Sequence, residues 1–491
     1  MSGNKFSLPA FSSYRNISGQ YKDSYIRNSF AVKISEDDES VRIAVAESKA
    51  CEAIPFLKNL HASKNVIPTV VSDSDFAEFI GNIVDSHSVA DKDECKENPF
   101  ALESVSESAP AVNIINATCI EAVRRGASDI HIQCEADSVR IRFRIDGVLK
   151  TSRTLEKSVF PSLSSRIKVM ANMNIMEQRL PQDGHISVSE GNKSLDFRVS
   201  VVPNAYGESI VLRLFDNSES VQKLSQLGFS QENYETIKKT SSIPNGLVII
   251  TGPTGSGKTT TLHALLGEMD AERLKIITIE DPVEKLLPHI DQIQVNEAIG
   301  LTFESVLSKL LRQDPDVIMV GEIRDSATAQ LAVRAALTGH LIFSTLHTND
   351  SVSAISRLRN MGVEPYLISS VLRFSLAQRL VRKVCPYCSK SVPLSAEMSA
   401  LAKKYDLHGE TMKESVGCEK CLFTGYKGRT AVSEVFEVDG DVTEAIDEMK
   451  GDSALYDIFR KKGMRTMQED AVNKVLSGET TFQEVVREGL A

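Results

Sequence analysis

The pattern of apolar and polar positions changes along the chain and divides it into regions with different expected structures. In VRIRFRIDG, at 139–147, every second residue is apolar, which is typical of a strand with one buried face. The apolar residues at 113–125 follow a helical spacing instead, and this pattern ends at Gly126. The strand-like alternation returns at 185–189, 195–201 and 209–215. We therefore predict a small α+β domain over residues 111–220.

Beyond residue 225 the pattern changes to short, fully apolar runs separated by helical segments. Such runs are typical of buried strands in a mainly parallel sheet whose two faces are covered by helices. Two of the helical segments are clear, at 261–269 and 327–337. The predicted strands are 246–251, 275–280, 317–322 and 340–346. Residues 225–491 are therefore predicted to form an α/β domain of the kind that binds nucleotides.

The N-terminal region has a different organisation. Residues 1–90 contain strand-like stretches at 41–47 and 65–71 among helical patterns, and residues 91–110 are rich in charge, serine and proline. A folded module on a charged linker is the arrangement expected for docking to a partner. We therefore predict a docking domain over residues 1–90 and a linker over residues 91–110.

The C-terminal segment, residues 452–491, has a helical pattern and no residues with an evident chemical role. Thr481 and Glu484 have the spacing of a capping box, in which each side chain binds the other residue's backbone N–H. These helices are expected to serve packing alone.

Composition and charge exclude several classes of protein. The chain has 491 residues, of which 42% are hydrophobic and 25% charged, the balance of a folded protein with about three domains. A net charge of −10 provides no basic field for a phosphate backbone, so nucleic acid is not an expected partner. No apolar run reaches membrane-spanning length, and the N-terminus lacks the apolar core of a secretory signal. We expect a cytoplasmic protein.

A phosphate-binding loop is the most specific motif in the chain. Residues 252–259 read Gly-x-x-x-x-Gly-Lys-Thr between a predicted strand and a predicted helix, which is the context this loop requires. The glycines let backbone N–H groups point inward, Lys258 reaches the terminal phosphates, and the Thr259 hydroxyl ligates Mg²⁺. The expected ligands are ATP and Mg²⁺. The predicted nucleotide contacts are Gly252, Pro253, Thr254, Gly255, Ser256, Gly257, Lys258, Thr259 and Thr260.

Acidic residues stand at the ends of two predicted strands, where the ligands of open α/β sheets collect. One cluster contains Glu280, Asp281 and Glu284, and the other contains Glu322. Hydrolysis of a phosphoanhydride needs a carboxylate to orient water and others to hold hydrated Mg²⁺, which makes Glu284 and Glu322 candidates. Which acid has which role is open, and either cluster alone could instead cap a helix or occupy a solvated turn.

Four of the eight cysteines have the spacing of a metal site. Two Cys-x-x-Cys pairs, separated by twenty-nine residues, contain Cys385, Cys388, Cys418 and Cys421. Two such pairs suit one tetrahedral Zn²⁺, and a site with four thiolates and no open position is structural rather than catalytic. The segment between the pairs would otherwise lack support, so we expect the metal to hold a zinc-binding subdomain at residues 383–431 together.

These motifs stand in the order and spacing of a known family. GPTGSGKTTTL, IEDPVE, LLRQDPDVIMVGEIRD and LTGHLIFSTLHTND closely resemble the secretion ATPases of the type II secretion and type IV pilus assembly family. The upstream segments ASDIHI, RFRIDGVL, RLPQDGHISV and GESIVLRL match that family as well. The resemblance covers about residues 112–491. It implies a RecA-like ATPase core at 225–491 and a PAS-like smaller domain at 111–220.

The resemblance also implies roles for individual acids and histidines. The family's Walker B acid corresponds to Glu322, and its Asp box corresponds to Glu280, Asp281 and Glu284. Its His box corresponds to His340 and His347, which would sense the γ-phosphate or link neighbouring subunits. Each histidine could instead be a hydrogen-bonded residue of the core.

Four arginines are expected near the phosphates of the nucleotide. Arg198 and Arg213 stand where the family pattern places arginines that reach the nucleotide from the smaller domain. Strand alternation supports this role, because it turns their neighbours toward the core and both arginines toward the other face. The alternative is a solvated strand face without a ligand. Arg312 and Arg324, which flank the Walker B strand, are further candidates.

The function implied by the resemblance is that of a ring-shaped motor, a hexamer that hydrolyses ATP to drive assembly of pilin-like subunits. The implied partner of residues 1–90 is an inner-membrane platform protein, with the ATPase bound peripherally to that membrane. Type II secretion and type IV pilus assembly share these core motifs, and we favour secretion because the chain has that family's length. The four-cysteine element, typically missing from pilus retraction ATPases, argues against a retraction motor.

Two other classes of protein are open on the sequence. A nucleic-acid translocase with the same core would need basic or aromatic residues in a central channel, and the acidic composition and absence of tryptophan argue against it. A scaffold that binds ATP without hydrolysing it would have no need of Lys258, Glu284, Glu322 and the paired arginines.

Overall fold

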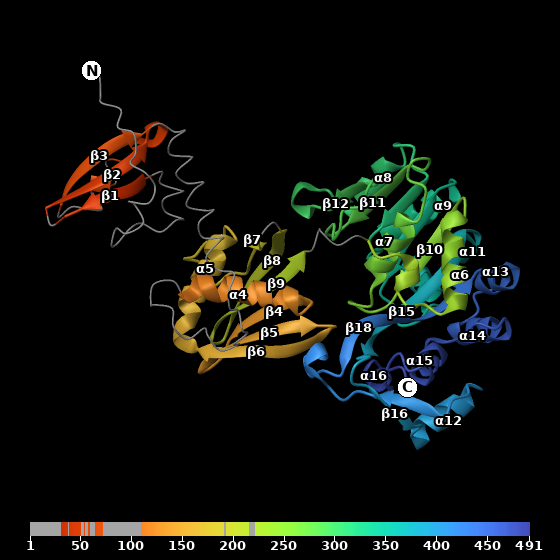
Figure 1. Cartoon of the computed structure of the whole chain (residues 1–491). Coiled ribbons are helices and arrows are strands. Elements are labelled where there is room, and N and C mark those ends of the chain that lie inside the picture. Colours follow the sequence, from red (N-terminus) through yellow and green to blue (C-terminus); the bar gives the residue numbers. More distant parts are fainter. Residues whose placement is uncertain are drawn as a thin grey trace. The chain divides into compact units, whose positions relative to one another are not determined.

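The structure is a computed structural model of the whole chain (Figure 1). The residues that it describes are 31–37, 39–50, 54, 57–58, 64–71, 110–190, 193–215 and 221–491. The chain separates into two compact units, 1–105 and 106–491, each with a hydrophobic core of its own.

The N-terminal unit contains a three-stranded sheet. Strand β1 (Ala31–Glu36) pairs antiparallel with β2 (Ser40–Ala46), which pairs parallel with β3 (Asn65–Val71). The two strands predicted in this region are therefore confirmed as β2 and β3. Alternate residues of β2 contribute to a small core. The predicted linker at 91–110 lies outside the described residues, except for Pro110 at the start of the next helix.

Residues 110–215 form an antiparallel sheet of six strands with two helices packed on one face (Figure 1). The helices are α4 (Pro110–Arg124) and α5 (Phe160–Met170). In spatial order the strands are β6 (Val148–Glu156), β5 (Ser138–Ile145), β4 (Ala127–Cys134), β9 (Gly207–Phe215), β8 (Lys193–Asn204) and β7 (Gln182–Glu190). The helix and the strands predicted from alternation are all present, and together they form the expected α+β arrangement.

Alternation along the strands separates the core face of this sheet from its polar face. Val139, Ile141 and Phe143 of β5 are at most 1% exposed and belong to the core formed with α4 and α5. Strands β8 and β9 pair in a register that places Arg198 directly opposite Arg213. Because the neighbours of both arginines are in the core, the two guanidinium groups share the opposite face of the sheet.

The larger sheet has seven strands and is parallel except at one edge. In spatial order the strands are β12 (Asp291–Gln294), β11 (Ile276–Glu280), β13 (Val317–Val320), β14 (Leu341–Leu346), β10 (Gly246–Thr251), β15 (Leu372–Val384) and β18 (Tyr426–Glu437). Strand β18 pairs antiparallel with β15. The four strands predicted from apolar runs are confirmed as β10, β11, β13 and β14.

Helices cover both faces of this sheet. One face packs against α6 (Gln231–Lys239) and α7 (Lys258–Gly267). The other face packs against α8 (Phe303–Leu310), α9 (Ser326–Leu337), α10 (Ser353–Asn360), α11 (Pro365–Val371), α13 (Gly440–Asp447) and α14 (Asp452–Lys461). Burial on both faces explains why the central strands are continuously apolar. Within the described part of the chain, no helix has the length and apolar composition needed to span a membrane.

The far part of the β15–β18 pair supports a separate cluster of helices (Figure 1). This cluster contains α12 (Ala396–Lys404), α15 (Met467–Leu476) and α16 (Phe482–Arg487). Between the two cysteine pairs, β16 (Lys390–Pro393) and β17 (Thr411–Glu414) form a small antiparallel sheet. The expectation that the segment between the cysteine pairs lacks support without a metal is therefore wrong, because α12 is packed in this cluster.

The capping box predicted at the start of α16 is only half formed. The Thr481 hydroxyl accepts a hydrogen bond of 3.2 Å from the N–H of Glu484. The Glu484 carboxylate, however, accepts hydrogen bonds of 2.6–3.0 Å from the guanidinium groups of Arg382 and Arg487. Several hydrogen bonds from two guanidinium cations stabilise the carboxylate more than one bond from a neutral backbone N–H would. A tertiary contact with β15 therefore overrides the local motif.

A buried aspartate links α15 to β18. Asp470 is 3% exposed, and its carboxylate accepts a hydrogen bond of 2.9 Å from the N–H of Ser433. Burial raises the pKa of Asp470 to about 6, and the nearby charge of Lys474 opposes this effect only in part. The folded protein therefore binds this proton more tightly than the unfolded chain. The contribution of Asp470 to stability should fall as the pH rises from about 4 to about 6.

We predict that Asp470→Asn removes this pH dependence. The free energy of unfolding of the variant, minus that of the wild type, should increase between about pH 4 and about pH 6, by at most ~3 kcal/mol. Denaturant titrations at a series of pH values measure this difference. Asp457→Asn, at an exposed position of α14, is the matched control and should show no trend. A difference that stays constant with pH for Asp470→Asn would contradict the assignment.

Candidate active site and metal centre

The phosphate-binding loop connects β10 to α7. Gly252, Gly255 and Gly257 have φ angles of 146°, 80° and 87°, and these positive values turn the loop back toward the start of α7. A Cβ on Gly252 would lie 2.4 Å from the carbonyl oxygen of Gln378, so that only glycine fits there. Gly257 precedes α7 without a capping side chain, so the first N–H groups of the helix can bind an anion.

The remaining residues of the loop differ in exposure. Pro253 and Thr254 lie at its exposed tip, whereas Ser256 is buried. In the first turn of α7, Thr259 is half-buried and Thr260 is exposed. The loop and the first turn of the helix therefore present a polar surface on which a phosphate chain can lie.

Lys258 is folded onto the loop. Its ammonium group donates hydrogen bonds to the carbonyl oxygens of Gly252 and Pro253, at 2.8 and 3.1 Å. Burial lowers the pKa of Lys258, and the charge of Glu322 opposes this shift. A phosphate would offer the lysine charge-assisted hydrogen bonds, which are stronger than those to neutral carbonyl groups. Lys258 is therefore placed to exchange its present partners for a phosphate.

Gln378 of β15 joins the loop to the helix that follows it. Its amide N–H donates to the carbonyl oxygen of Ser256 at 2.8 Å, and its side-chain oxygen accepts from the Thr261 hydroxyl at 2.9 Å. The residue is 1% exposed. Sequence analysis missed Gln378, because the sequence of β15 mixes apolar residues with several polar and charged ones and so does not distinguish this glutamine.

Glu322, Arg324 and His347 meet beside the loop, just beyond the ends of β13 and β14. One carboxylate oxygen of Glu322 binds Arg324, and the other lies 3.4 Å from Nε2 of His347. Arg324 also lies 3.4 Å from a carboxylate oxygen of Asp281. The side chains of Arg324 and His347 are each 52% exposed, so this group of charges opens to solvent. Four of the predicted site residues are thus brought together.

The residue after His347 anchors this group to the loop. The Thr348 hydroxyl lies 2.6 Å from the hydroxyl of Thr251, the last residue of β10. The N–H of Thr348 donates to the same Thr251 oxygen at 2.9 Å. These two bonds hold the end of β14 against the start of the phosphate-binding loop. Sequence analysis did not identify either threonine.

The two ends of the predicted Asp box have opposite environments. Glu280 is 3% exposed and forms hydrogen bonds of 2.6–3.0 Å with His263, Thr278 and Gln292. Burial opposes its ionisation, but these hydrogen bonds prevail and lower the pKa of Glu280. Because this buried network occupies both of its oxygens, Glu280 ties α7 to the sheet. Its predicted contact with a nucleotide stays a prediction. Glu284 is exposed, with no hydrogen bond or ion pair to any described residue.

Two predicted residues lie at the opposite edge of the sheet. His340 precedes β14, and its carbonyl oxygen accepts a hydrogen bond of 3.1 Å from Gly246 at the start of β10. Its Nδ1 atom lies 2.9 Å from the carbonyl oxygen of Ala335. Arg312 lies in the exposed turn between α8 and β13. The strands separate this edge from the loop by roughly 13–20 Å. His340 and Arg312 thus lie away from the phosphate-binding loop of the same chain, and the nucleotide contacts predicted for them stay predictions.

The paired arginines of the smaller domain are engaged on their own sheet. Nε of Arg213 lies 2.8 Å from a carboxylate oxygen of Asp129, and the arginine side chain is still 67% exposed. The guanidinium group of Arg198 lies 4.5 Å from the centre of the Phe215 ring. Neither arginine forms a hydrogen bond or ion pair with the phosphate-binding loop in this structure. They form a pair of basic side chains on the polar face of the smaller sheet.

Two cavities differ in their relation to the loop. One, of about 300 Å³, is lined by Gly257, Thr260 and Thr261 and by the side chain of Gln378. It continues from the phosphate-binding loop and offers room beside the first turn of α7. The larger cavity, of about 430 Å³, lies in the smaller domain and contains none of the predicted site residues.

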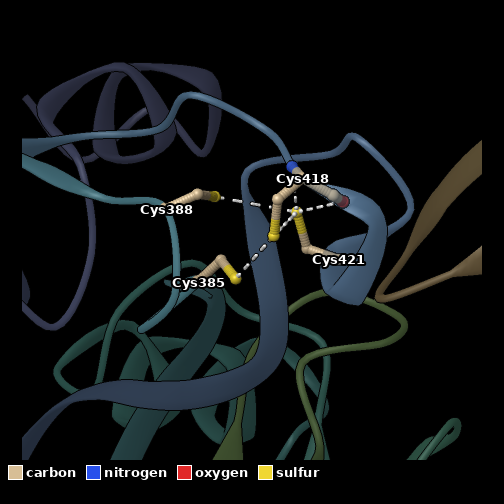
Figure 2. A group of neighbouring side chains, drawn as sticks. All are labelled: Cys385, Cys388, Cys418 and Cys421. Atoms are coloured by element: carbon tan, nitrogen blue, oxygen red, sulfur yellow. Dashed lines mark hydrogen bonds between the residues drawn. The ribbon is translucent and has the colours of Figure 1, made fainter.

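The four predicted cysteines form one cluster (Figure 2). Their sulfur atoms all lie within 4.8 Å of one another. The separation is 3.9 Å between Cys385 and Cys418, and 3.8 Å from Cys421 to both Cys388 and Cys418. For four sulfurs at about 2.3 Å from a central zinc ion, tetrahedral geometry puts neighbouring sulfurs about 3.8 Å apart. The cluster therefore has the dimensions of a zinc site.

Backbone N–H groups around the cluster favour thiolates. Gly417 donates to the sulfur of Cys388 at 3.3 Å, and Cys418 and Gly425 donate to the sulfur of Cys421 at 3.2 and 3.3 Å. Burial opposes ionisation of Cys421, but these two N–H groups lower the pKa of its thiol. Because a metal binds the thiolate form of cysteine, the donor set and its surroundings fit zinc.

Comparison with known proteins identifies, over most of the chain, the same family that the motifs resemble. A family model described as Type II/IV secretion system protein matches residues 104–487. The chain is 44% identical over 411 residues to type II secretion system protein E of Aeromonas hydrophila, which covers 84% of this chain and 81% of that protein. It is also 44% identical over 394 residues to the type IV pilus assembly ATPase PilB of Thermus thermophilus, which covers 80% of this chain and 44% of PilB.

A solved structure of similar fold is that of the pilus retraction motor PilT with bound ADP. It has a TM-score of 0.51 and 25% sequence identity, over 77% of this chain and 96% of PilT. The family model spans the phosphate-binding loop, Glu322 and all four clustered cysteines, so the resemblance inferred from the motifs is confirmed. This chain belongs to the type II/IV secretion system protein family and is an ATPase.

Proposed function

We propose that this protein is the motor of a type II secretion machine. A ring of six copies hydrolyses ATP to drive assembly of pilin-like subunits, and this assembly moves proteins across the outer membrane. The observation that carries the motor chemistry is the convergence of Lys258, Glu322 and His347 beside the phosphate-binding loop. The choice of secretion is supported by coverage, because the chain spans 81% of the Aeromonas relative but only 44% of PilB.

The environments of the charged residues support a division of roles. Lys258 and the N–H groups at the start of α7 bind the phosphates. Thr259 and Glu322 would hold the hydrated Mg²⁺, which when bound neutralises charge between the phosphates. Glu284, exposed and unpaired among the described residues, orients the attacking water. Arg324, paired with Glu322 in this structure, exchanges that partner for the terminal phosphate.

Arg198 and Arg213 supply positive charge from a different domain. Their cross-strand pairing presents two guanidinium groups on the polar face of the sheet, where Arg213 is exposed and Arg198 is half-buried. This arrangement suits an anion approaching from outside that sheet. In a ring, such an anion is the phosphate chain held across a boundary between domains or subunits. ATP favours the closed boundary and hydrolysis removes that preference, so that turnover opens and closes the gap.

The N-terminal domain, residues 1–90, connects this motor to the membrane. We assign it to bind the cytoplasmic part of an inner-membrane platform protein. This contact keeps the ATPase in the cytoplasm at the inner-membrane surface. The proposal is supported by the separation of the chain into two compact units, which gives the N-terminal region a core of its own.

The first prediction from these roles concerns the two carboxylates. Glu284→Gln should lower kcat for ATP by roughly 10²–10³-fold with little change in nucleotide affinity, because it removes only the group that orients water. Glu322→Gln should also weaken the dependence of nucleotide binding on Mg²⁺. Steady-state hydrolysis and nucleotide titrations with and without Mg²⁺ distinguish these effects. Glu304→Gln, at an exposed position of α8, is the control. The opposite pattern would exchange the two roles.

The choice between secretion and pilus assembly requires a measurement in the source bacterium. A chromosomal Lys258→Ala variant, which loses phosphate binding, should retain exported proteins in the periplasm that the wild type releases into the medium. Quantification of both fractions, with surface pili counted in parallel, measures this outcome. Loss of pili with normal secretion would support the pilus assembly alternative instead. If neither process changes, both forms of the proposal fail.

We also propose that Cys385, Cys388, Cys418 and Cys421 bind one structural Zn²⁺ in each chain. When bound, the metal cross-links the loop after β15 to the segment before β18. The matching sulfur separations of 3.8–3.9 Å support this assignment. Because α12 packs against α15, metal loss should release the two cysteine loops while this helix stays folded.

Metal release and hydrogen exchange test this prediction. Cys418→Ser should lose nearly all of the one equivalent of zinc, whereas Cys134→Ser, which alters a buried cysteine outside the cluster, should keep it. In the metal-free variant, amides at 387–389 and 418–425 should exchange rapidly, and those of α12 should stay protected. Full zinc content in Cys418→Ser would refute the site. Exchange throughout α12 would refute its independent packing.

A further inference from the structure

The loop that follows β14, residues 347–353, carries His347 and is anchored at several points beyond the phosphate-binding loop. The Asp350 carboxylate accepts a hydrogen bond of 2.7 Å from the N–H of Ser353, at the start of α10. The Ser351 carbonyl oxygen accepts a hydrogen bond of 2.7 Å from the hydroxyl of Ser375 in β15. Ser351 is fully buried. The position of His347 therefore depends on a loop that is held from the interior of the domain.

The strongest of these anchors is the carboxylate of Glu434, in β18. It accepts hydrogen bonds from the N–H and the hydroxyl of Ser351, at 2.7 and 2.8 Å. It also accepts from the hydroxyl of Tyr456 in α14 and from the N–H of Met467 at the start of α15, both at 3.1 Å. One side chain thus connects the His347 loop to two C-terminal helices.

Glu434 depends on these donors. The residue is 2% exposed, and among the described residues the structure pairs it with no cation. A buried carboxylate without a counter-charge is costly unless its oxygens are hydrogen-bonded. A displacement of Ser351 or Tyr456 would leave part of that charge unsatisfied. The loop and the helices are therefore held in one relative position.

Tyr456 lies between two carboxylates of this region. Burial, followed by the charges of Glu434 and Asp350, raises the pKa of the Tyr456 phenol. The phenol therefore stays protonated and acts as a hydrogen-bond donor at any physiological pH. Its ring packs against the core of the larger sheet. The hydroxyl, rather than the ring, is the part of α14 that reaches the loop.

We propose that Glu434 and Tyr456 are positioning residues for ATP hydrolysis, which hold the loop 347–353 so that His347 stays beside Glu322. This inference rests on the role in hydrolysis proposed for Glu322. The sequence predicts only a packing role for α14. The proposal adds a role in ATP hydrolysis, which the helix performs indirectly by holding the loop 347–353.

The test is Tyr456→Phe in the full-length protein. This variant removes one hydroxyl and leaves the ring and the three other hydrogen bonds of Glu434 in place, whereas a substitution of Glu434 itself risks misfolding. We expect kcat for ATP to fall roughly tenfold and KM to change less than twofold, because the loop loses one anchor while the phosphate-binding loop is unaltered. Steady-state hydrolysis measures both constants.

Tyr426→Phe is the matched control. Its hydroxyl is also buried, 2.7 Å from the hydroxyl of Thr481, and has no contact with the loop 347–353. Both variants should lose a similar amount of thermal stability, measured as Tm, and only Tyr456→Phe should lose kcat. Equal kcat in the two variants would overturn the proposal. Glu322→Gln, measured in parallel, distinguishes failure of this inference from failure of the role proposed for Glu322. Wild-type turnover in Glu322→Gln would refute the role of Glu322, whatever the ratio of kcat between the two tyrosine variants.

Discussion

The site depends on one constraint, the parallel register of three neighbouring strands. Thr251 of β10 lies opposite Leu346 of β14, and Val320 of β13 lies opposite Ser344 of the same strand. The strands therefore end at nearly the same level, and the residues that follow them reach one edge of the sheet. Lys258, Glu322 and His347 are remote in sequence, and this register is what makes them neighbours. A shift of one of these strands by two residues would move the site residue that follows it by roughly 7 Å from the other two.

Buried polar groups hold this edge in place. Gln378 binds the phosphate-binding loop, Glu280 ties α7 to β11, and Glu434 anchors the loop that carries His347. Buried polar atoms need their hydrogen-bond partners, so each of these side chains permits only one arrangement of the elements that it joins. The exposed groups, in contrast, have partners that a nucleotide can replace. The buried side chains therefore keep the site rigid, and the exposed ones can exchange partners each time a nucleotide binds and is hydrolysed.

The smaller domain and the cysteine cluster contribute in other ways. Alternation along two paired strands puts Arg198 and Arg213 side by side on the polar face of the smaller sheet, where Arg213 pairs with Asp129. The cysteine cluster closes the far end of the β15–β18 pair, and β15 also carries Gln378. One strand, β15, thus binds the phosphate-binding loop through Gln378 and leads directly to Cys385. The phosphate-binding loop and the cysteine cluster are therefore both supported by this strand.

The sequence by itself determined the parts of this protein that depend on local pattern. Apolar runs identified the central strands, alternation identified the smaller sheet, and fixed spacings identified the phosphate-binding loop and the four cysteines, because each of these features is encoded within a few residues or as a repeated motif. Only the tertiary structure decided which motif residues meet. Glu280 and Glu284 share one motif, yet one is buried in a network with His263 and the other is exposed. His340 and His347 are seven positions apart and flank β14, and the length of that strand places them at opposite edges of the sheet. Contacts such as those of Gln378 and Glu434 join residues that are remote in sequence, and no local pattern records them.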